Sequence, residues 1–113
     1  MSYEVLIVPA VRDRIRQQAE YIAIEQKAPR MAARWLARVY DQVETLAEMP
    51  RRCPIPPEAA WLDYELRCLL IWEFALFFTV IDETSTVWVV HAKHGRQLSQ
   101  PDDFPADLEG LEE

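Results

Sequence analysis

The segment Phe74–Ile81 constrains the fold of this chain more than any other part of its sequence. It reads Phe-Ala-Leu-Phe-Phe-Thr-Val-Ile, so both of the faces that alternate along an extended strand are apolar. A strand with two apolar faces belongs in the interior of a sheet rather than at its edge. The segment therefore predicts a central strand, with further strands on either side of it.

The neighbouring segments predict those strands. From Tyr64 to Leu70 apolar side chains recur at every second position, as expected for a strand. Trp72-Glu73 indicates a reversal before the central strand, and the polar run Asp82–Ser85 indicates a turn after it. The apolar, β-branched segment Thr86–His91 is then a third strand. Together the three predict an antiparallel meander.

The N-terminal half predicts one more strand and a helical hairpin. Tyr3–Val8 is apolar and β-branched, and Pro9 ends it. Apolar residues then recur at steps of three and four, predicting a helix from about Val11 and a second one over Arg30–Glu48. The short link Gln26–Pro29 favours antiparallel packing of the two helices.

The predicted order is therefore β-α-α-β-β-β, an α+β fold in which a helical hairpin packs on a small antiparallel sheet. The first strand is expected to join one edge of the meander. A chain of 113 residues, half of them hydrophobic, fits one folded domain, which we assign to residues 1–98. Residues 99–113 form an acidic tail.

The charge is distributed unevenly between these two parts. Twelve basic and thirteen acidic residues precede residue 99, and six acidic residues follow it. The formal net charge of −7 thus comes mainly from the tail, and it does not exclude nucleic acid as a partner of the nearly neutral body of the domain.

Other classes of protein are disfavoured. No apolar run approaches the roughly 18 residues of a membrane helix, and the N-terminus does not resemble a secretory signal, so we expect a cytoplasmic protein without a membrane partner. Cys53 and Cys68 have the spacing of neither a redox pair nor a zinc knuckle and are expected to be reduced thiols. No metal site and no cofactor is predicted.

Five segments give the chain a resemblance to a known family. They are Tyr21-Ile22, Leu46–Pro50, Leu66-Arg67, Phe74–Asp82 and Val89–Arg96. Their order and spacing resemble those of the RelE/ParE superfamily, the toxins (plasmid stabilisation proteins) of bacterial type II toxin–antitoxin systems. The resemblance covers nearly the whole chain up to Arg96.

The resemblance implies growth inhibition, and it leaves three functions open. ParE-like members poison DNA gyrase, whereas RelE-like members are ribosome-dependent endoribonucleases that cleave mRNA. Both are neutralised by a cognate antitoxin, and family members also form homodimers. A decayed toxin that only binds its antitoxin is the third alternative, so whether the chain is an enzyme stays open.

The candidate catalytic residues are Arg67, His91, Lys93, His94 and Arg96. RNA cleavage requires a proton carrier and cations that stabilise the charge developing on phosphorus. Histidine carries protons near neutral pH, and arginine and lysine supply positive charge. Each residue also has an ordinary structural interpretation, such as a solvated pair between Arg67 and Glu65, and the group equally suits contacts with a protein target.

Two departures from the nuclease pattern favour the ParE-like interpretation. RelE-like nucleases carry an arginine early in the central strand, after an aromatic residue, where this chain has Ala75. They also carry lysines on the preceding strand, whereas here no lysine lies between Lys27 and Lys93.

Aromatic residues and the tail supply two further hypotheses. Trp35, Tyr40, Trp61 and Trp72 are candidates for the surface that the antitoxin covers, or else part of the core. The acidic tail is expected to be a short helix or a solvated end. We hypothesise that it lies near Lys93 and Arg96, where it damps activity or mimics a phosphate partner.

Overall fold

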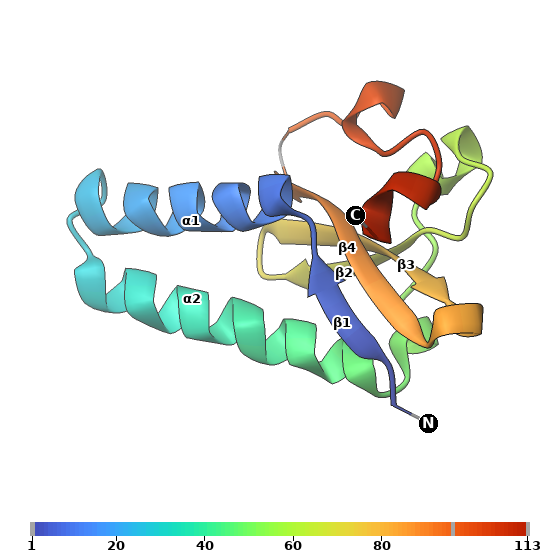
Figure 1. Ribbon diagram of the computed structural model, residues 1–113. Helices are drawn as coiled ribbons and strands as arrows, with labels where there is room; N and C mark the ends of the chain where they lie inside the picture. Colours follow the sequence, from blue (N-terminus) through green and yellow to red (C-terminus); the bar gives the residue numbers. More distant parts are fainter. Residues whose placement is uncertain (1, 96, 113) are drawn as a thin grey trace.

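Four strands form a single sheet in the order β1-β4-β3-β2, and two helices cover one of its faces (Figure 1). This computed structural model describes residues 2–95 and 97–112. The elements are β1 (Glu4–Ile7), α1 (Pro9–Ile24), α2 (Pro29–Glu44), β2 (Arg67–Ile71), β3 (Phe74–Ile81) and β4 (Thr86–His94). The predicted α+β order is confirmed.

The predicted meander is also confirmed, with β3 antiparallel to both β2 and β4. The first strand joins the meander in parallel with β4, so the sheet is mixed. Backbone hydrogen bonds fix this junction at both ends, because Glu4 N–H donates to Ser85 O at 2.9 Å and Val8 N–H donates to Val89 O at 3.1 Å.

Two strand boundaries differ from the prediction. β2 begins at Arg67 rather than Tyr64, because the chain before it is held by loop contacts: Tyr64 donates its hydroxyl proton to Pro105 O at 2.8 Å. β4 continues to His94, three residues past the predicted end. It does so because Phe74 and Ala75 at the start of β3 still pair with His94 and Lys93.

The second helix is shorter than predicted. It ends at Glu44 rather than Glu48 and is followed by a 3₁₀ turn over Thr45–Ala47. The Thr45 hydroxyl donates to Gln42 O at 2.6 Å, an interaction that satisfies a carbonyl at the helix end.

The core lies on both faces of the sheet. On the helix face, Ile15, Val39, Leu76 and Phe78 are fully buried together. On the opposite face, a smaller cluster brings together Leu66, Cys68, Ala75, Phe77, Val90 and Phe104. Both apolar faces of β3 are thus covered, as its composition predicts.

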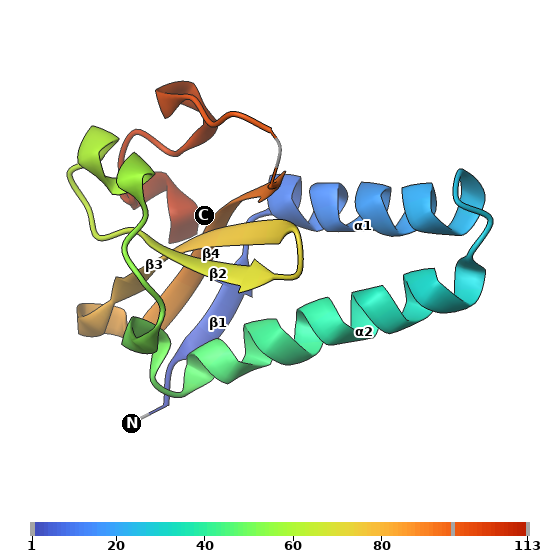
Figure 2. The same ribbon diagram turned by 180° about the vertical axis from the view of Figure 1, so that it is seen from behind.

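The C-terminal segment provides the cover on that second face. The Phe104 ring lies edge-on to Phe77 with centroids 5.5 Å apart, and its centroid is 4.9 Å from that of His91. In Figures 1 and 2 the segment crosses the side of the sheet that faces away from the helices. The acidic tail is therefore folded onto the domain, with one buried aromatic side chain as its anchor.

Substitution of that anchor should destabilise the protein. Phe104→Ala removes a side chain that is only 5% exposed, and we expect a loss of about 3 kcal/mol in the free energy of unfolding. Urea denaturation followed by circular dichroism measures it. Leu98→Ala is the control, because Leu98 is 92% exposed and its removal should change nothing. Equal stability of the two variants would show that the tail does not hold this position in solution.

Candidate functional site

The candidate residues on β4 lie on opposite faces of the sheet. A bulge shifts the register between Phe77 and Phe78, so that Phe77 pairs with His91 and Phe78 pairs with Val89. After the bulge, His91 and Lys93 contact the side covered by the C-terminal segment, whereas His94 adjoins α1. Arg96, the fifth candidate, lies outside the described residues.

His91 is buried between aromatic rings. It is stacked on Phe77 at a centroid distance of 5.6 Å, and Phe104 covers it edge-on. Its Nε2 atom lies 3.9 Å from a carboxylate oxygen of Asp103 in the tail. Burial lowers the pKa of His91 despite the nearby carboxylate, because the charged imidazolium is poorly solvated there. The ring is therefore neutral at physiological pH and packed as part of a small core.

Lys93 is engaged on the same face. Its Nζ atom lies 3.3 Å from Oε2 of Glu58 and 5.8 Å from the centroid of the Phe77 ring. Burial by itself raises the pKa of Glu58, but hydrogen bonds from its own backbone and from Lys93 bring it below the ordinary value. Directly across the strand pair, Ala75 is 3% exposed. Ala75, which occupies the position where RelE-like nucleases carry an arginine, is therefore buried and not accessible to a substrate.

Arg67 connects loops to the start of β2. Its Nε donates to Glu65 Oε2 at 2.6 Å, and Nη1 donates to the carbonyl oxygens of Cys53 at 2.8 Å and Arg51 at 3.2 Å. The predicted pairing with Glu65 is present, although the pair is less solvated than expected, with 17% of the Arg67 side chain exposed. The Arg67 guanidinium is thus held by contacts within the protein.

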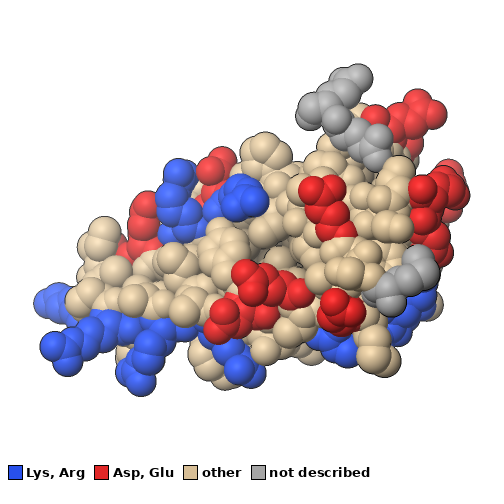
Figure 3. Space-filling view, turned by 60° about the horizontal axis from the view of Figure 1, so that its bottom comes forward, with Lys and Arg blue, Asp and Glu red and all other residues tan. Residues whose placement is uncertain are grey.

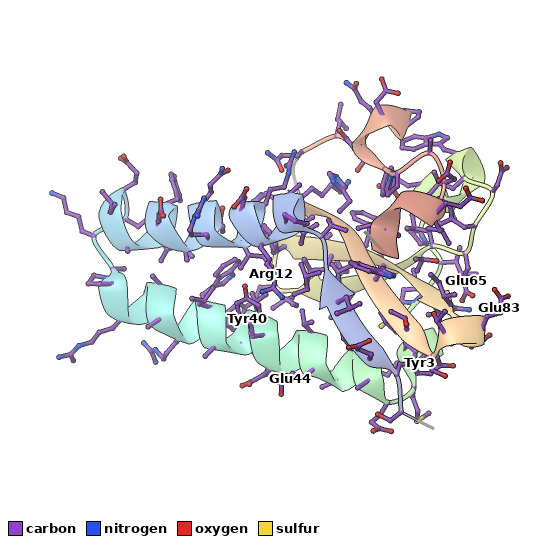
Figure 4. All side chains as sticks on the ribbon, in the orientation of Figure 1. Tyr3, Arg12, Tyr40, Glu44, Glu65 and Glu83 are labelled. Atoms are coloured by element: carbon purple, nitrogen blue, oxygen red, sulfur yellow. The ribbon has the colours of Figure 1, made fainter. Side chains whose placement is uncertain are left out.

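A neighbouring arginine extends this network. Arg51 donates to Glu65 at 3.0 Å and to Asp82 at 2.9 Å, and Tyr3 donates its hydroxyl proton to Asp82 at 2.9 Å. Hydrogen bonds from Arg51 and Tyr3 lower the pKa of Asp82. Tyr3 and Glu65 lie at the same end of the sheet in Figure 4. The network therefore fastens β1, the loop before β2 and the β3–β4 turn to one another. Arg51 is not among the residues that the sequence marks as candidates, because no motif includes it.

His94 lies in a polar hollow between the end of β4 and α1. Its Nε2 atom is 3.4 Å from Oε2 of Glu73, and its backbone N–H donates to Gln97 Oε1 at 2.9 Å. The next residue, Gly95, donates its N–H to Glu73 O, and a Cβ atom added at this glycine would lie only 3.0 Å from that oxygen. A glycine at this position therefore allows the end of β4 to approach the β2–β3 turn closely.

The hollow has a volume of about 180 Å³. Its lining includes four side chains of α1, Arg14, Gln17, Gln18 and Tyr21, of which the sequence marks only Tyr21, and that as part of a family motif rather than as a site residue. They recur at helical spacing on a polar face, which a sequence alone does not distinguish from an ordinary solvated face.

The four candidate aromatic residues divide between core and surface. Trp35 is 8% exposed, and its ring lies edge-on to that of Phe74 with centroids 5.3 Å apart. Trp35 therefore belongs to the core and not to an exposed surface. Tyr40 is half-buried and packs against the same core. Trp61 and Trp72 are exposed, at 46% and 65%. Trp72 occupies the β2–β3 turn with φ 54°, a left-handed conformation that is uncommon for a bulky residue.

The cysteines are free and buried. Burial raises the pKa of Cys68 to about 11, and it also raises the pKa of Cys53, so both thiols are protonated at neutral pH. Across residues 2–95 and 97–112 no group of three or more His, Cys, Asp or Glu side chains is placed to hold a metal ion. No helix in this part of the chain has the length and hydrophobicity to cross a membrane.

Comparison with known proteins agrees with this architecture. Residues 5–99 match the model of the family described as the ParE toxin of type II toxin–antitoxin system, parDE. The chain therefore belongs to the ParE toxin family, within the RelE/ParE group that the sequence resembles. No curated protein matches the chain significantly.

The environment of His91 predicts a dependence of stability on pH. Its lowered pKa means that the folded state binds this proton less readily than the unfolded chain, where histidine titrates near pH ~6.5. The contribution of neutral His91 to the free energy of unfolding is fully present above that pH and is lost as the pH falls below it. His91→Phe keeps a flat ring between Phe77 and Phe104 and should remove much of the decrease in unfolding free energy between about pH 7 and 5.

Urea denaturation at several pH values measures this decrease. His94→Gln removes the other histidine and is the matched control, which should retain it. An unchanged pH dependence in His91→Phe would contradict the burial of a neutral imidazole.

Proposed function

We propose that this toxin inhibits growth in the ParE-like manner, by binding an essential protein target such as DNA gyrase in the cytoplasm. The observation that supports this most is the separation of its candidate catalytic groups. RNA cleavage needs a base, an acid and cations that converge on one phosphate. Here His91 lies beneath Phe104, Lys93 is paired with Glu58, and His94 adjoins α1.

Induction of the protein in cells tests the proposal. DNA, RNA and protein synthesis are followed after induction, with and without the neighbouring gene product. We expect DNA damage signalling with intact early translation, because a poisoned gyrase damages DNA and leaves ribosomes working. Loss of translation with cleaved mRNA would instead identify a RelE-like nuclease. Normal growth would identify a decayed toxin that only binds antitoxin.

We further propose that the cognate antitoxin inserts an apolar helical or extended segment between the two helices. A groove of about 620 Å³ runs there. Its lining is mainly small or apolar, with Ala19, Ala23, Ala32, Ala33, Leu36 and Tyr40, and its charged lining residues are Arg12, Asp13, Arg16 and Glu20. Figure 4 shows Arg12 of α1 and Tyr40 of α2 close to one another across the gap between the helices. Small residues let a second backbone approach closely. Arg16 is paired with Asp13 and Glu20, so the groove suits an apolar segment rather than a strongly charged one.

A large side chain in this groove should block neutralisation. Ala33→Arg fills the groove without weakening the helix, and we expect growth inhibition that the co-expressed antitoxin no longer relieves. Ala37→Arg is the matched control, since Ala37 is exposed on the same helix and does not line the groove. Co-purification on a tagged antitoxin gives a second readout. Full rescue of Ala33→Arg cells would place the antitoxin elsewhere.

A further inference from the structure

The hollow at His94 continues along the helices as a groove. A second hollow of about 440 Å³ shares Gln18, Tyr21 and His94 with the first, and a third of about 590 Å³ shares Gln26 with the second. The third reaches Trp72 and α2. We call this continuous surface the hairpin-tip groove, because the turn between β2 and β3 forms one of its walls. In Figure 2 this turn points toward the paired helices.

The end of the groove at α1 is suited to a small anion. Arg14, Gln18 and Tyr21 follow one another at steps of four and three, so their side chains project from the same side of the helix. His94 faces them from the end of β4. Glu73 is the only carboxylate that lines the groove within the described residues, and it is 75% exposed beside His94. Guanidinium, imidazole, amide and hydroxyl groups together suit a phosphate.

The opposite end of the groove presents an aromatic ring. Trp72 is held in a left-handed turn with most of its side chain in solvent, although an indole ring is normally buried. The Arg38 guanidinium lies 5.9 Å from the ring centroid, and Arg34 and Met31 line the groove beside it. A flat exposed ring next to a guanidinium is a platform on which a nucleobase can stack.

Positive charge continues past this end along α2. Arg30, Arg34 and Arg38 are exposed at steps of four residues, Lys27 precedes them, and no acidic residue lies between positions 26 and 40. In the described part of the chain, none of the four forms an ion pair within the protein, unlike Arg16, which pairs with two carboxylates. Figure 3 shows basic side chains along this edge of the molecule. An uncompensated row of this kind attracts a polyanion.

We propose that the hairpin-tip groove binds single-stranded nucleic acid. Its phosphates lie against Arg14 and His94 at one end and along the α2 arginines at the other, and a base stacks on Trp72. An acidic peptide would satisfy the arginines but would leave the exposed indole face without a planar partner. The proposal involves no cleavage and does not depend on gyrase, so it stands or falls separately from the proposed function.

Binding is measured by fluorescence anisotropy with short labelled oligothymidylate and oligouridylate. We expect salt-dependent binding by the full chain. Trp72→Ala should weaken it by roughly tenfold through lost stacking, and Trp72→Phe should restore much of it. Arg14→Gln should weaken binding and reduce the slope of log K against log salt by about 0.7, the value for one phosphate contact on a single strand.

Arg12→Gln is the matched control. It removes the same charge from the same helix, but Arg12 lines the groove between the helices instead. Its salt slope should fall by less than that of Arg14→Gln, and its affinity should stay close to that of the unsubstituted chain. Equal losses in the two variants would overturn the proposal in favour of unspecific attraction. Absence of salt-dependent binding to either oligonucleotide would overturn it as well. The proposal would also be overturned if a polyglutamate peptide bound more tightly than the oligonucleotides and the same variants weakened its binding. The groove would then bind an acidic protein segment.

Discussion

The burial of β3 on both faces is the constraint on which the rest of the structure depends. Phe77 and Phe78 are adjacent in sequence and almost wholly inaccessible to solvent, and they belong to different cores. The helices cover Phe78, but they cannot reach Phe77 through the sheet. A second cover is therefore required, and the C-terminal segment supplies it through Phe104. The acidic tail, which the sequence predicts as a short helix or a solvated end, is thus partly a structural element.

The same constraint determines what β4 can do. It pairs with β1 and β3, so its side chains are divided between two enclosed faces. The His91 ring packs against Phe104 of the tail and the Lys93 ammonium pairs with Glu58, whereas His94 lines the hollow beside α1. A catalytic site built from consecutive residues of a central strand would need all of their side chains on one face that a substrate can reach. A strand that completes the core on both sides offers contact residues at its end instead.

The sequence predicts most of this architecture, because apolar periodicity reports directly on which faces are buried. The strand Phe74–Ile81, the helical hairpin and the meander follow from it. The bulge opposite Phe77 and Phe78 does not, since nothing in the sequence distinguishes Val90 from the valines at positions 87 and 89. Strict alternation would have placed His91 beneath the helices with Val89. The contribution of α1 to the groove does not follow either, because Arg14 and Gln18 match an ordinary solvated helix face until the β2–β3 turn is placed beside them.

The two grooves give the helical hairpin two independent surfaces. Arg12, Arg16 and Ala19 of α1 line the groove between the helices, whereas Arg14, Gln18 and Tyr21 of the same helix line the hairpin-tip groove. A helix makes this division possible because side chains two residues apart point in widely different directions. An antitoxin segment seated between the helices therefore leaves Arg14 and Trp72 accessible. If both proposals hold, the neutralised toxin still binds nucleic acid, and the antitoxin acts by covering the surface that the growth target requires.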